Sequence, residues 1–139
     1  MWTQVRGMDE SQRKRFLDCL APGGAGVGFA VLGGSFGEGI DLRGDRLVGA
    51  FVATLGLPQV NPRNEQLKAC LESVFGSGYD YTYLYPGIQK VVQAAGRVIR
   101  TQDDRGVVYV IDDRFARPAV QELLPSWWRI NAYAAGPNK

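Results

Sequence analysis

Three uninterrupted apolar stretches constrain the fold of this chain more than any other feature. Residues 27–33, 48–55 and 106–112 do not alternate apolar with polar residues at every second position. A strand with one face in water alternates in that way, whereas a strand covered on both faces does not. Helical patterns lie between the stretches. The sequence therefore predicts an α/β fold with a mainly parallel sheet, helices on both of its faces and a site at its carboxyl edge.

Helix boundaries are marked most clearly around residues 61–76. Asn61 is suited to cap a helix N-terminus, Pro62 to occupy the first turn, and Gly76 to end the helix. The pattern predicts a helix over residues 62–75. Its apolar stripe consists of Leu67, Cys70, Leu71, Val74 and Phe75.

Weaker signals outline the other elements. Residues 2–5 are typical of the end of a strand, and we expect the chain to be a piece of a longer domain. Asp9 followed by Gln12 resembles a capping box and predicts a helix with Phe16 in its apolar stripe. The other expectations are an irregular aromatic segment over 79–85, a helix from Pro86 to about Arg100, a short helix over 119–124 and a flexible tail over 131–139.

The composition bounds the size and the chemistry of the chain. With 139 residues and 45% apolar content it can bury one core, so one domain is expected over residues 1–130. The 16 basic and 14 acidic side chains nearly balance, so the overall charge favours no class of partner. Histidine is absent, which excludes Ser-His-Asp catalysis, Cys-His catalysis and imidazole metal ligands.

The cysteines and the absence of long apolar runs exclude further classes. Cys19 and Cys70 lie far apart and neither belongs to a CxxC pair, which argues against a zinc site and a disulfide framework. We expect both to be core residues. The sequence shows neither a membrane-spanning apolar stretch nor the order of a signal peptide. The protein is therefore expected to be soluble and cytoplasmic.

Residues 87–100 carry the most informative polar pattern. Drawn as a helix, one side is apolar and the other gathers Gln89, Gln93, Gly96, Arg97 and Arg100. A solvated face normally mixes both signs of charge, whereas this face bears arginines and no acid. The guanidinium fork suits contact with phosphate oxygens, and a glycine inside a helix costs about 1 kcal/mol unless another backbone approaches closely.

Two interpretations of this polar face stay open at the level of residue chemistry. In the first, Arg97 and Arg100 bind phosphate groups of a ligand. In the second, they pair with Asp103 or Asp104 just downstream and serve the structure alone.

A glycine-rich segment, residues 33–42, directly follows the first predicted strand of the buried type. Its glycines permit positive φ and close approach of a ligand, and Glu38 and Asp41 offer acceptor oxygens. A simple tight turn would fit the same residues. The earlier glycines at 23–28 precede a strand, which is the reverse of a dinucleotide fingerprint, and the chain has no GxxxxGK[ST] loop. Any nucleotide must therefore be held mainly by another domain.

Together the two polar segments resemble helicase motifs. Residues 34–41, GSFGEGID, resemble motif V of XPD/DinG-like superfamily 2 DNA helicases, and residues 93–100, QAAGRVIR, resemble motif VI. The segments 56–58, 61–62 and 103–106 also look like bacterial members of that family, so the resemblance covers nearly the whole chain. It implies a RecA-like three-layer αβα domain, of which the chain would form the C-terminal portion of helicase domain 2.

The resemblance also implies a function and a set of site residues. ATP would lie in a cleft between this domain and the first RecA-like domain of the parent chain. The first domain would hold most of the ATP and the Mg²⁺. Hydrolysis of ATP would drive translocation on single-stranded DNA. Arg100 matches the arginine finger and Arg97 a second catalytic phosphate contact. The implied ATP contacts are Gln93, Gly96, Arg97, Arg100, Glu38, Gly39 and Asp41, and the implied DNA contacts are Gly34, Ser35 and Phe36.

The sequence departs from the family at two positions, where Gly37 replaces a common bulky aromatic and Arg43 a common proline. An iron–sulfur cluster of the parent would lie in the first domain, and no metal ligand is expected here. A bacterial parent would be associated with the nucleoid, and the isolated chain is expected to be inactive.

Two other hypotheses stay open: a free-standing RecA-like module that binds nucleic acid or protein without hydrolysis, and a small α/β enzyme with Glu38 and Asp41 as paired carboxylates in a closed pocket.

Overall fold

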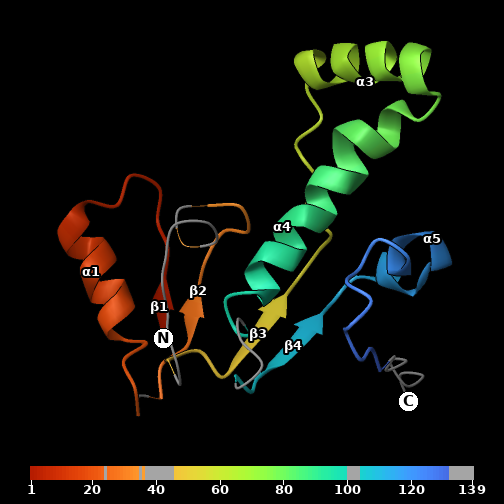
Figure 1. Ribbon diagram of the computed structural model, residues 1–139. Helices are drawn as coiled ribbons and strands as arrows, with labels where there is room; N and C mark the ends of the chain where they lie inside the picture. The colour runs from red at the N-terminus through yellow and green to blue at the C-terminus, as the bar shows by residue number, and fades with distance from the viewer. Residues whose placement is uncertain (24, 35, 37–45, 100–103, 132–139) are drawn as a thin grey trace, which may run out of the picture.

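The computed structural model describes residues 1–23, 25–34, 36, 46–99 and 104–131. Helices and strands alternate through much of the chain (Figure 1). The elements are β1 (Trp2–Thr3), α1 (Glu10–Asp18), β2 (Gly28–Phe29), β3 (Gly49–Val52), α3 (Pro62–Phe75), the π-helix η2 (Asp80–Leu84), α4 (Tyr85–Ala95), β4 (Val107–Val110), the 3₁₀ helix η3 (Asp113–Ala116) and α5 (Pro118–Gln121).

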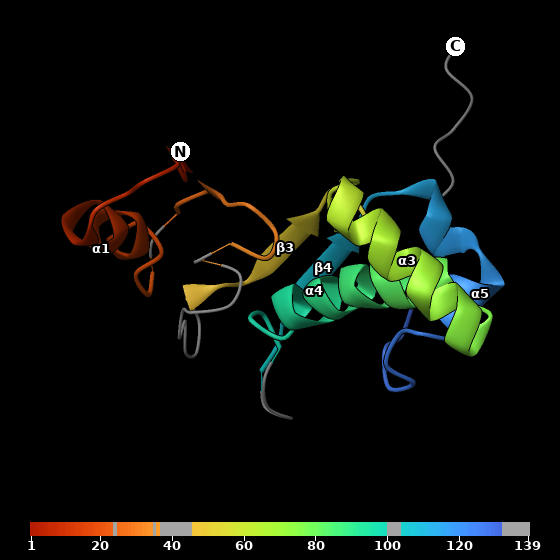
Figure 2. The same cartoon turned by 90° about the horizontal axis from the view of Figure 1, so that it is seen from above.

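The described strands form two parallel pairs, which confirms the predicted α/β class. β1 pairs with β2, with Trp2 opposite Gly28, and β3 pairs with β4, with Phe51 opposite Tyr109. Seen from above, α4 lies along one face of the β3–β4 pair (Figure 2). The hydrophobic core fills the space between this face, α4 and the segment around α5. Its buried members are Val52, Leu55, Ile88, Val91, Phe115, Val120 and Leu124.

The opposite face of the β3–β4 pair is exposed, which corrects the expectation of strands covered on both faces. Val52 points into the core, whereas the neighbouring Phe51 is 73% exposed and stacks on Tyr109 at a centroid distance of 4.9 Å. Val107 and Ile111 are exposed as well, as is Phe29 of β2. The apolar runs reflect two apolar faces, but the described residues supply a helix to only one face of this pair.

Helix α4 is preceded by a π-helix where the sequence predicted irregular structure. The wide turns of Asp80–Leu84 lead directly into α4. Aromatic rings stabilise this segment, because Tyr81 contacts Tyr85 edge to face at 5.1 Å and Tyr79 contacts Tyr83 at 5.6 Å. Backbone hydrogen bonding along the chain therefore continues through a stretch whose sequence looked unstructured.

Helix α4 ends at Ala95, short of the predicted end near Arg100. The N–H of Gly96 donates to the Val92 carbonyl at 2.9 Å, and the next two N–H groups donate to carbonyls only three residues earlier. This tighter turn directs Val98 into the interior, where it is buried. The predicted apolar side of the helix is otherwise confirmed, since Ile88, Val91 and Ala95 are buried.

The predicted boundaries of α3 are confirmed at both ends. The side-chain oxygen of Asn61 accepts the N–H of Asn64 at 2.9 Å, Pro62 begins the helix, and Gly76 ends it with a left-handed φ of 68°. The helix lies at the far end of the molecule from β1 and β2 (Figure 1). These local signals fix the length of the helix but not its orientation.

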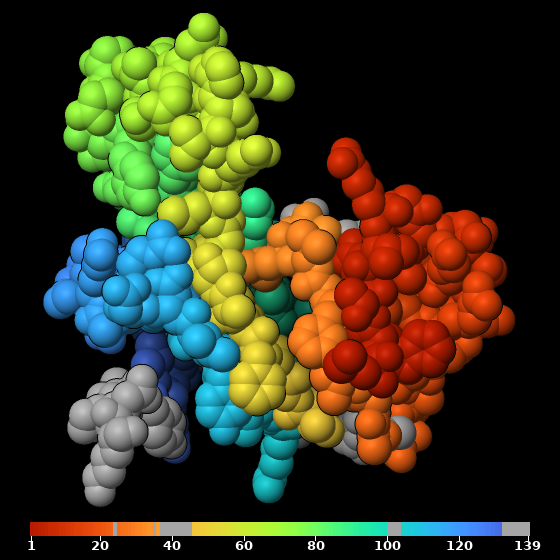
Figure 3. Space-filling model, turned by 180° about the vertical axis from the view of Figure 1, so that it is seen from behind, coloured from red at the N-terminus to blue at the C-terminus, as the bar shows by residue number. Residues whose placement is uncertain are grey.

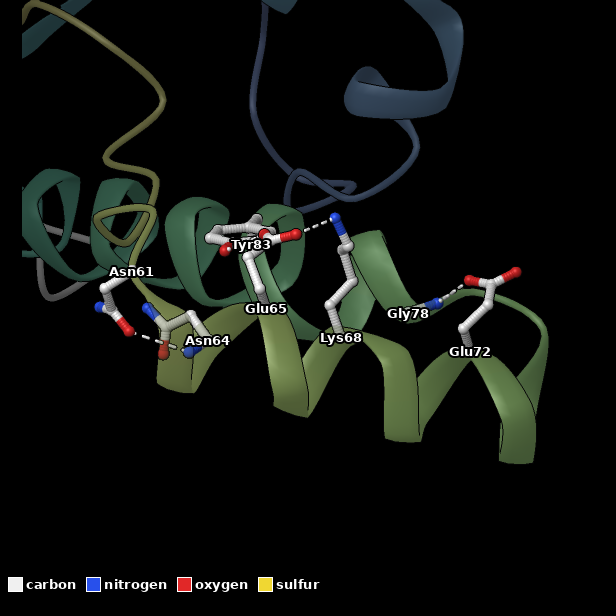
Figure 4. Close-up of polar contacts among 7 residues, drawn as sticks. All are labelled: Asn61, Asn64, Glu65, Lys68, Glu72, Gly78 and Tyr83. Carbon is white, nitrogen blue, oxygen red and sulfur yellow. Dashed lines mark hydrogen bonds and ion pairs between the residues drawn. The ribbon is translucent and has the colours of Figure 1, made fainter.

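Helix α3 turns its polar side towards the protein. Glu65 accepts the hydroxyl of Tyr83 at 2.7 Å and pairs with Lys68, and Glu72 accepts the N–H of Gly78 at 2.6 Å (Figure 4). At 100° per residue the apolar stripe lies on the other side of the helix, and its exposed members are Leu67, Cys70, Val74 and Phe75.

The two cysteines are therefore not core residues, contrary to the prediction. Cys70 is exposed because it belongs to the outward stripe of α3, and Cys19 is half-buried just beyond the end of α1. Burial raises the pKa of the Cys19 thiol. Both thiols are free.

Two further segments complete the fold. The predicted capping box of α1 is confirmed, with Asp9 accepting the N–H of Gln12 at 2.8 Å and the Gln12 side chain accepting the N–H of Asp9 at 2.9 Å.

After β4, the Arg114 guanidinium donates to both carboxylate oxygens of Asp112, at 2.8 and 2.6 Å. This pairing holds the pKa of Asp112 well below its usual range and fixes the turn that leads into α5.

The part-buried hydrogen bond between Tyr83 and Glu65 predicts a pH dependence of stability. The hydrogen bond to Glu65, together with burial, raises the pKa of Tyr83 from 10 to about 12. The folded protein therefore holds this proton more tightly than the unfolded chain, and the resulting stability is present below pH 10 and lost as the pH rises towards 12. We expect the melting temperature of the wild type to exceed that of Tyr83→Phe at pH 8 and the difference to shrink above pH 10. A difference that stays constant with pH would contradict this role.

Candidate functional site

The described residues cover part of the predicted site. Gln93, Gly96 and Arg97 are described on the motif VI side, and Gly34 and Phe36 on the motif V side. The remaining predicted residues, which lie outside the described residues, are Ser35, Glu38, Gly39, Asp41 and Arg100.

The motif VI residues lie at the C-terminal end of α4. Gln93 is exposed and lines a shallow hollow together with Tyr85, Gln89 and Leu123. Arg97 is half-buried in the tight turn that follows the helix. No acidic residue occurs anywhere in α4. The described part of this surface therefore presents amide and guanidinium donors, which fit a polyanionic ligand.

Gly96 does not occupy the mid-helix position that the sequence predicted. It is the C-terminal cap of α4, with φ −64° and ψ −6°, a conformation open to any residue. A Cβ placed on it would lie 3.4 Å from the Val92 carbonyl oxygen, in ordinary contact, and no other described backbone comes closer. The close backbone approach inferred from this glycine is thus not seen within the described residues.

The motif V segment begins in a tight turn beside β1. The N–H of Gly34 donates to the Val31 carbonyl at 2.9 Å, and Gly33 has a left-handed φ of 74°. The side chain of Gln4 supports this turn from the neighbouring strand, because its oxygen accepts the N–H of Val31 at 2.9 Å. The left-handed backbone of the turn therefore favours glycine at position 33.

Phe36 is a packing residue in this structure. Its side chain is only 8% exposed, and its ring lies 4.3 Å from that of Phe16 on α1. The aromatic pair attaches the motif V segment to α1. The sequence placed Phe36 among the DNA contacts, and the burial of its ring leaves the backbone as the part that can face a ligand.

Gly33, which directly precedes the motif V segment, contacts the helix that leads into the motif VI segment. A Cβ on Gly33 would lie 2.9 Å from Cδ of Lys90 and 3.1 Å from its Cε, so the lysine stem lies directly over the glycine. The side chain of Leu32, the residue before Gly33, is in similarly close contact with Gly56, which follows β3. Figure 3 shows the orange segment that contains β2 directly beside the yellow segment that contains β3. The structure thus places Gly33, just before the motif V segment, against α4, the helix that leads into the motif VI segment.

Lys90 is the residue of this contact that the sequence analysis did not single out. It lies three residues before Gln93, a spacing that places these two side chains on one side of α4, and Arg97 follows in the turn beyond the helix. The spacing of Lys90 with Gln93 is the signal in the sequence.

The described residues contain few features of other classes of site. No group of three or more Cys, Asp or Glu side chains among them is placed to hold a metal ion. Within the same residues no helix has the length and apolarity to cross a membrane. The closed carboxylate pocket of the alternative enzyme hypothesis would involve Glu38 and Asp41, both outside the described residues.

Comparison with known proteins identifies the family. Residues 1–131 match the family described as helicase C-terminal domain. The chain is 38% identical over 106 residues to the ATP-dependent DNA helicase YoaA of Escherichia coli, covering 73% of the chain and 16% of the relative. It is 32% identical over 107 residues to the ATP-dependent DNA helicase DinG of Photobacterium profundum, with 73% and 15% covered.

A eukaryotic relative extends the match. The chain is 32% identical over 117 residues to the general transcription and DNA repair factor IIH helicase subunit XPD of Arabidopsis thaliana, covering 82% of the chain and 15% of the relative. The chain thus spans only 15–16% of the length of these three relatives. The chain belongs to the helicase C-terminal domain family, in the XPD/DinG-like group.

Proposed function

We propose that this chain forms the C-terminal part of the second motor domain of an ATP-dependent DNA helicase. The observation that carries the proposal is the contact between Gly33 and Lys90 in a chain of this family, because Gly33 directly precedes the motif V segment and Lys90 lies on the helix that leads into the motif VI segment. A motor needs such a connection, since events at the nucleotide must be transmitted to the DNA.

In the proposed ATP site, this chain contributes one wall. Arg100 acts as the arginine finger and Arg97 as a second phosphate contact, and Gln93, Gly96, Glu38, Gly39 and Asp41 line the same wall. The phosphate loop and Mg²⁺ ligands come from the first RecA-like domain of the parent. ATP bound there supplies the phosphoryl group that is transferred to water. The absence of acidic residues from α4 supports this assignment, because a triphosphate would repel them.

The proposed domain is a RecA-like three-layer αβα structure. The exposed outer face of the β3–β4 pair supports this proposal, since Phe51, Tyr109 and Ile111 form an apolar surface of the kind that a second helical layer covers. The proposed cover comes from the parent chain.

The proposed DNA contact is made by Gly34, Ser35 and Phe36 at the motif V turn. Because the Phe36 ring is buried, the contact uses the backbone of this segment. Backbone N–H groups bind phosphate oxygens without regard to base sequence. The site would therefore serve translocation along DNA of any sequence.

The proposal is tested by comparing the full-length protein with the isolated chain. We expect the full-length protein to hydrolyse ATP in response to single-stranded DNA and to unwind duplexes, and the isolated chain to show no turnover above background, because it has no phosphate loop. Turnover by the pure chain would contradict the division of the site between two domains. DNA binding by the full-length protein without any hydrolysis would instead favour a non-catalytic RecA-like binding module.

A further inference from the structure

Lys90 is held in an unusual way for a surface lysine. Its stem lies over Gly33, with Cγ 3.6 Å, Cδ 2.9 Å and Cε 3.1 Å from the point that a Cβ on Gly33 would occupy. Lysine side chains normally keep most of their rotamer freedom in water. Here packing against the glycine restricts the stem, and its last carbon places the ammonium group beside the Gly33–Gly34 turn.

The turn itself is held in place from the other side by Gln4. The Gln4 oxygen accepts the N–H of Val31, which leaves its amide nitrogen 3.2 Å from the position of a Cβ on Gly34. The Gln4 backbone N–H is in turn bound to the Phe29 carbonyl at 2.8 Å. The turn is therefore bordered by an ammonium group and an amide NH₂ group, both hydrogen-bond donors.

No acid neutralises Lys90 within the part of the chain that the structure describes. The ion pair of Lys68 with Glu65 and that of Arg114 with Asp112 do not involve Lys90, and α4 contains no acidic residue. A positive charge that is pre-positioned and half-buried beside a glycine turn, with no described acid paired to it, suits an anionic oxygen. The restricted stem also lowers the entropy that binding would cost.

We propose that Lys90, assisted by the amide of Gln4, binds a phosphate of the single-stranded DNA backbone where the strand passes the Gly33–Gly34 turn. This inference rests on the proposed helicase function and adds a contact to its DNA track. The ligand is the DNA strand and not the triphosphate because Lys90 lies five residues, about 8 Å, before the end of α4, and Arg97 lies beyond that end. Lys90 also contacts Gly33, which directly precedes the residues assigned to DNA.

The experiment measures binding of the full-length protein to a dye-labelled oligothymidylate by fluorescence anisotropy. The salt concentration is varied from about 50 to about 200 mM, which is enough to define the slope of log affinity against log salt. Loss of one phosphate contact should make the slope of log affinity against log salt shallower by about 0.7 and weaken binding about fivefold at 0.1 M salt. We expect this result for Lys90→Gln, whereas Lys90→Arg should retain the wild-type slope. Lys14→Gln, which removes an exposed lysine of α1, is the matched control and should also retain it.

The outcomes separate this inference from the function on which it rests. A wild-type slope for Lys90→Gln would overturn the Lys90 contact while leaving the helicase function intact. A raised KM for ATP in that variant with an unchanged DNA slope would also overturn it, in favour of a nucleotide contact. A wild-type protein that shows neither DNA binding nor DNA-stimulated hydrolysis would overturn both. Equal melting temperatures of wild type and Lys90→Gln would confirm that the change in slope does not come from misfolding.

Discussion

Replacing Arg100 by alanine in the full-length protein should lower DNA-stimulated ATP hydrolysis by about 10³–10⁵-fold, the range that arginine fingers contribute in related phosphoryl transfers. Negative charge must be stabilised on the phosphate oxygens as the γ-phosphoryl group leaves. A guanidinium group already in position does this without reorganisation, in a cleft that excludes water. Unwinding should fall together with hydrolysis, because it depends on the same turnover.

The matched control for Arg100→Ala is Arg13→Ala, which removes an exposed arginine from α1 and should leave hydrolysis and unwinding unchanged. Thermal melting of each variant distinguishes the two interpretations that the sequence left open. A lost finger predicts a melting temperature close to that of the wild type, because a side chain on a polar face contributes little to the core. Near-normal turnover would remove the finger role, and a lowered melting temperature with a proportional loss of activity would favour pairing of Arg100 with Asp103 or Asp104.

Local signals in the sequence predicted the ends of the helices that they flank. The caps of α3 at Asn61 and Gly76, and the capping box of α1, form in the structure as predicted, because each depends on residues within a few positions of one another. The predicted end of α4 was wrong by several residues. The helix gives way to the tight turn at Gly96–Val98, in which Val98 is buried, whereas the periodic apolar pattern continues through that turn and marks no end there.

Burial was predicted less well, because periodicity identifies the faces of an element but not what covers them. The apolar stripe of α3 is where the sequence placed it on the helix, but Glu65 and Glu72 bind donors on the neighbouring segment and turn that stripe outward. The β3–β4 pair has the two apolar faces that its sequence indicates, and the described helices cover one of them. Both errors concern partners, which a single sequence does not specify.

The sequence places the candidate site at its two motif-like segments, and sequence reasoning missed the contact between Gly33 and Lys90, which precede those segments. Lys90 precedes the motif VI pattern and Gln4 is far from motif V along the chain. Their roles follow from the parallel pairing of β1 with β2 and from the packing of α4 beside Gly33. Neither tertiary relation leaves a local signal in the sequence.

Leu55→Ala should destabilise the 139-residue chain by about 2–5 kcal/mol, the usual loss for a leucine truncated inside a core. Leu55 is 1% exposed and belongs to the core cluster with Ile88 and Val91. Its removal leaves a cavity between the end of the β3 segment and α4, where the surrounding backbone cannot readily collapse. Since a domain of this size has about 5–15 kcal/mol of total stability, the variant should lose a large part of it.

The matched control is Leu67→Ala on α3, which removes the same atoms from a side chain that is 47% exposed. We expect a loss below about 1 kcal/mol, because truncation on a largely exposed surface forfeits little burial and alanine favours a helix. The measurement is urea unfolding of wild type and both variants. The midpoints report stability when the slope of the unfolding free energy against urea concentration is the same for all three proteins. Equal losses at the two leucines would show that the stripe of α3 is packed in the folded protein and would contradict its outward orientation. A large loss at Leu55 alone would place the stabilising contacts in the core between the β3 segment and α4.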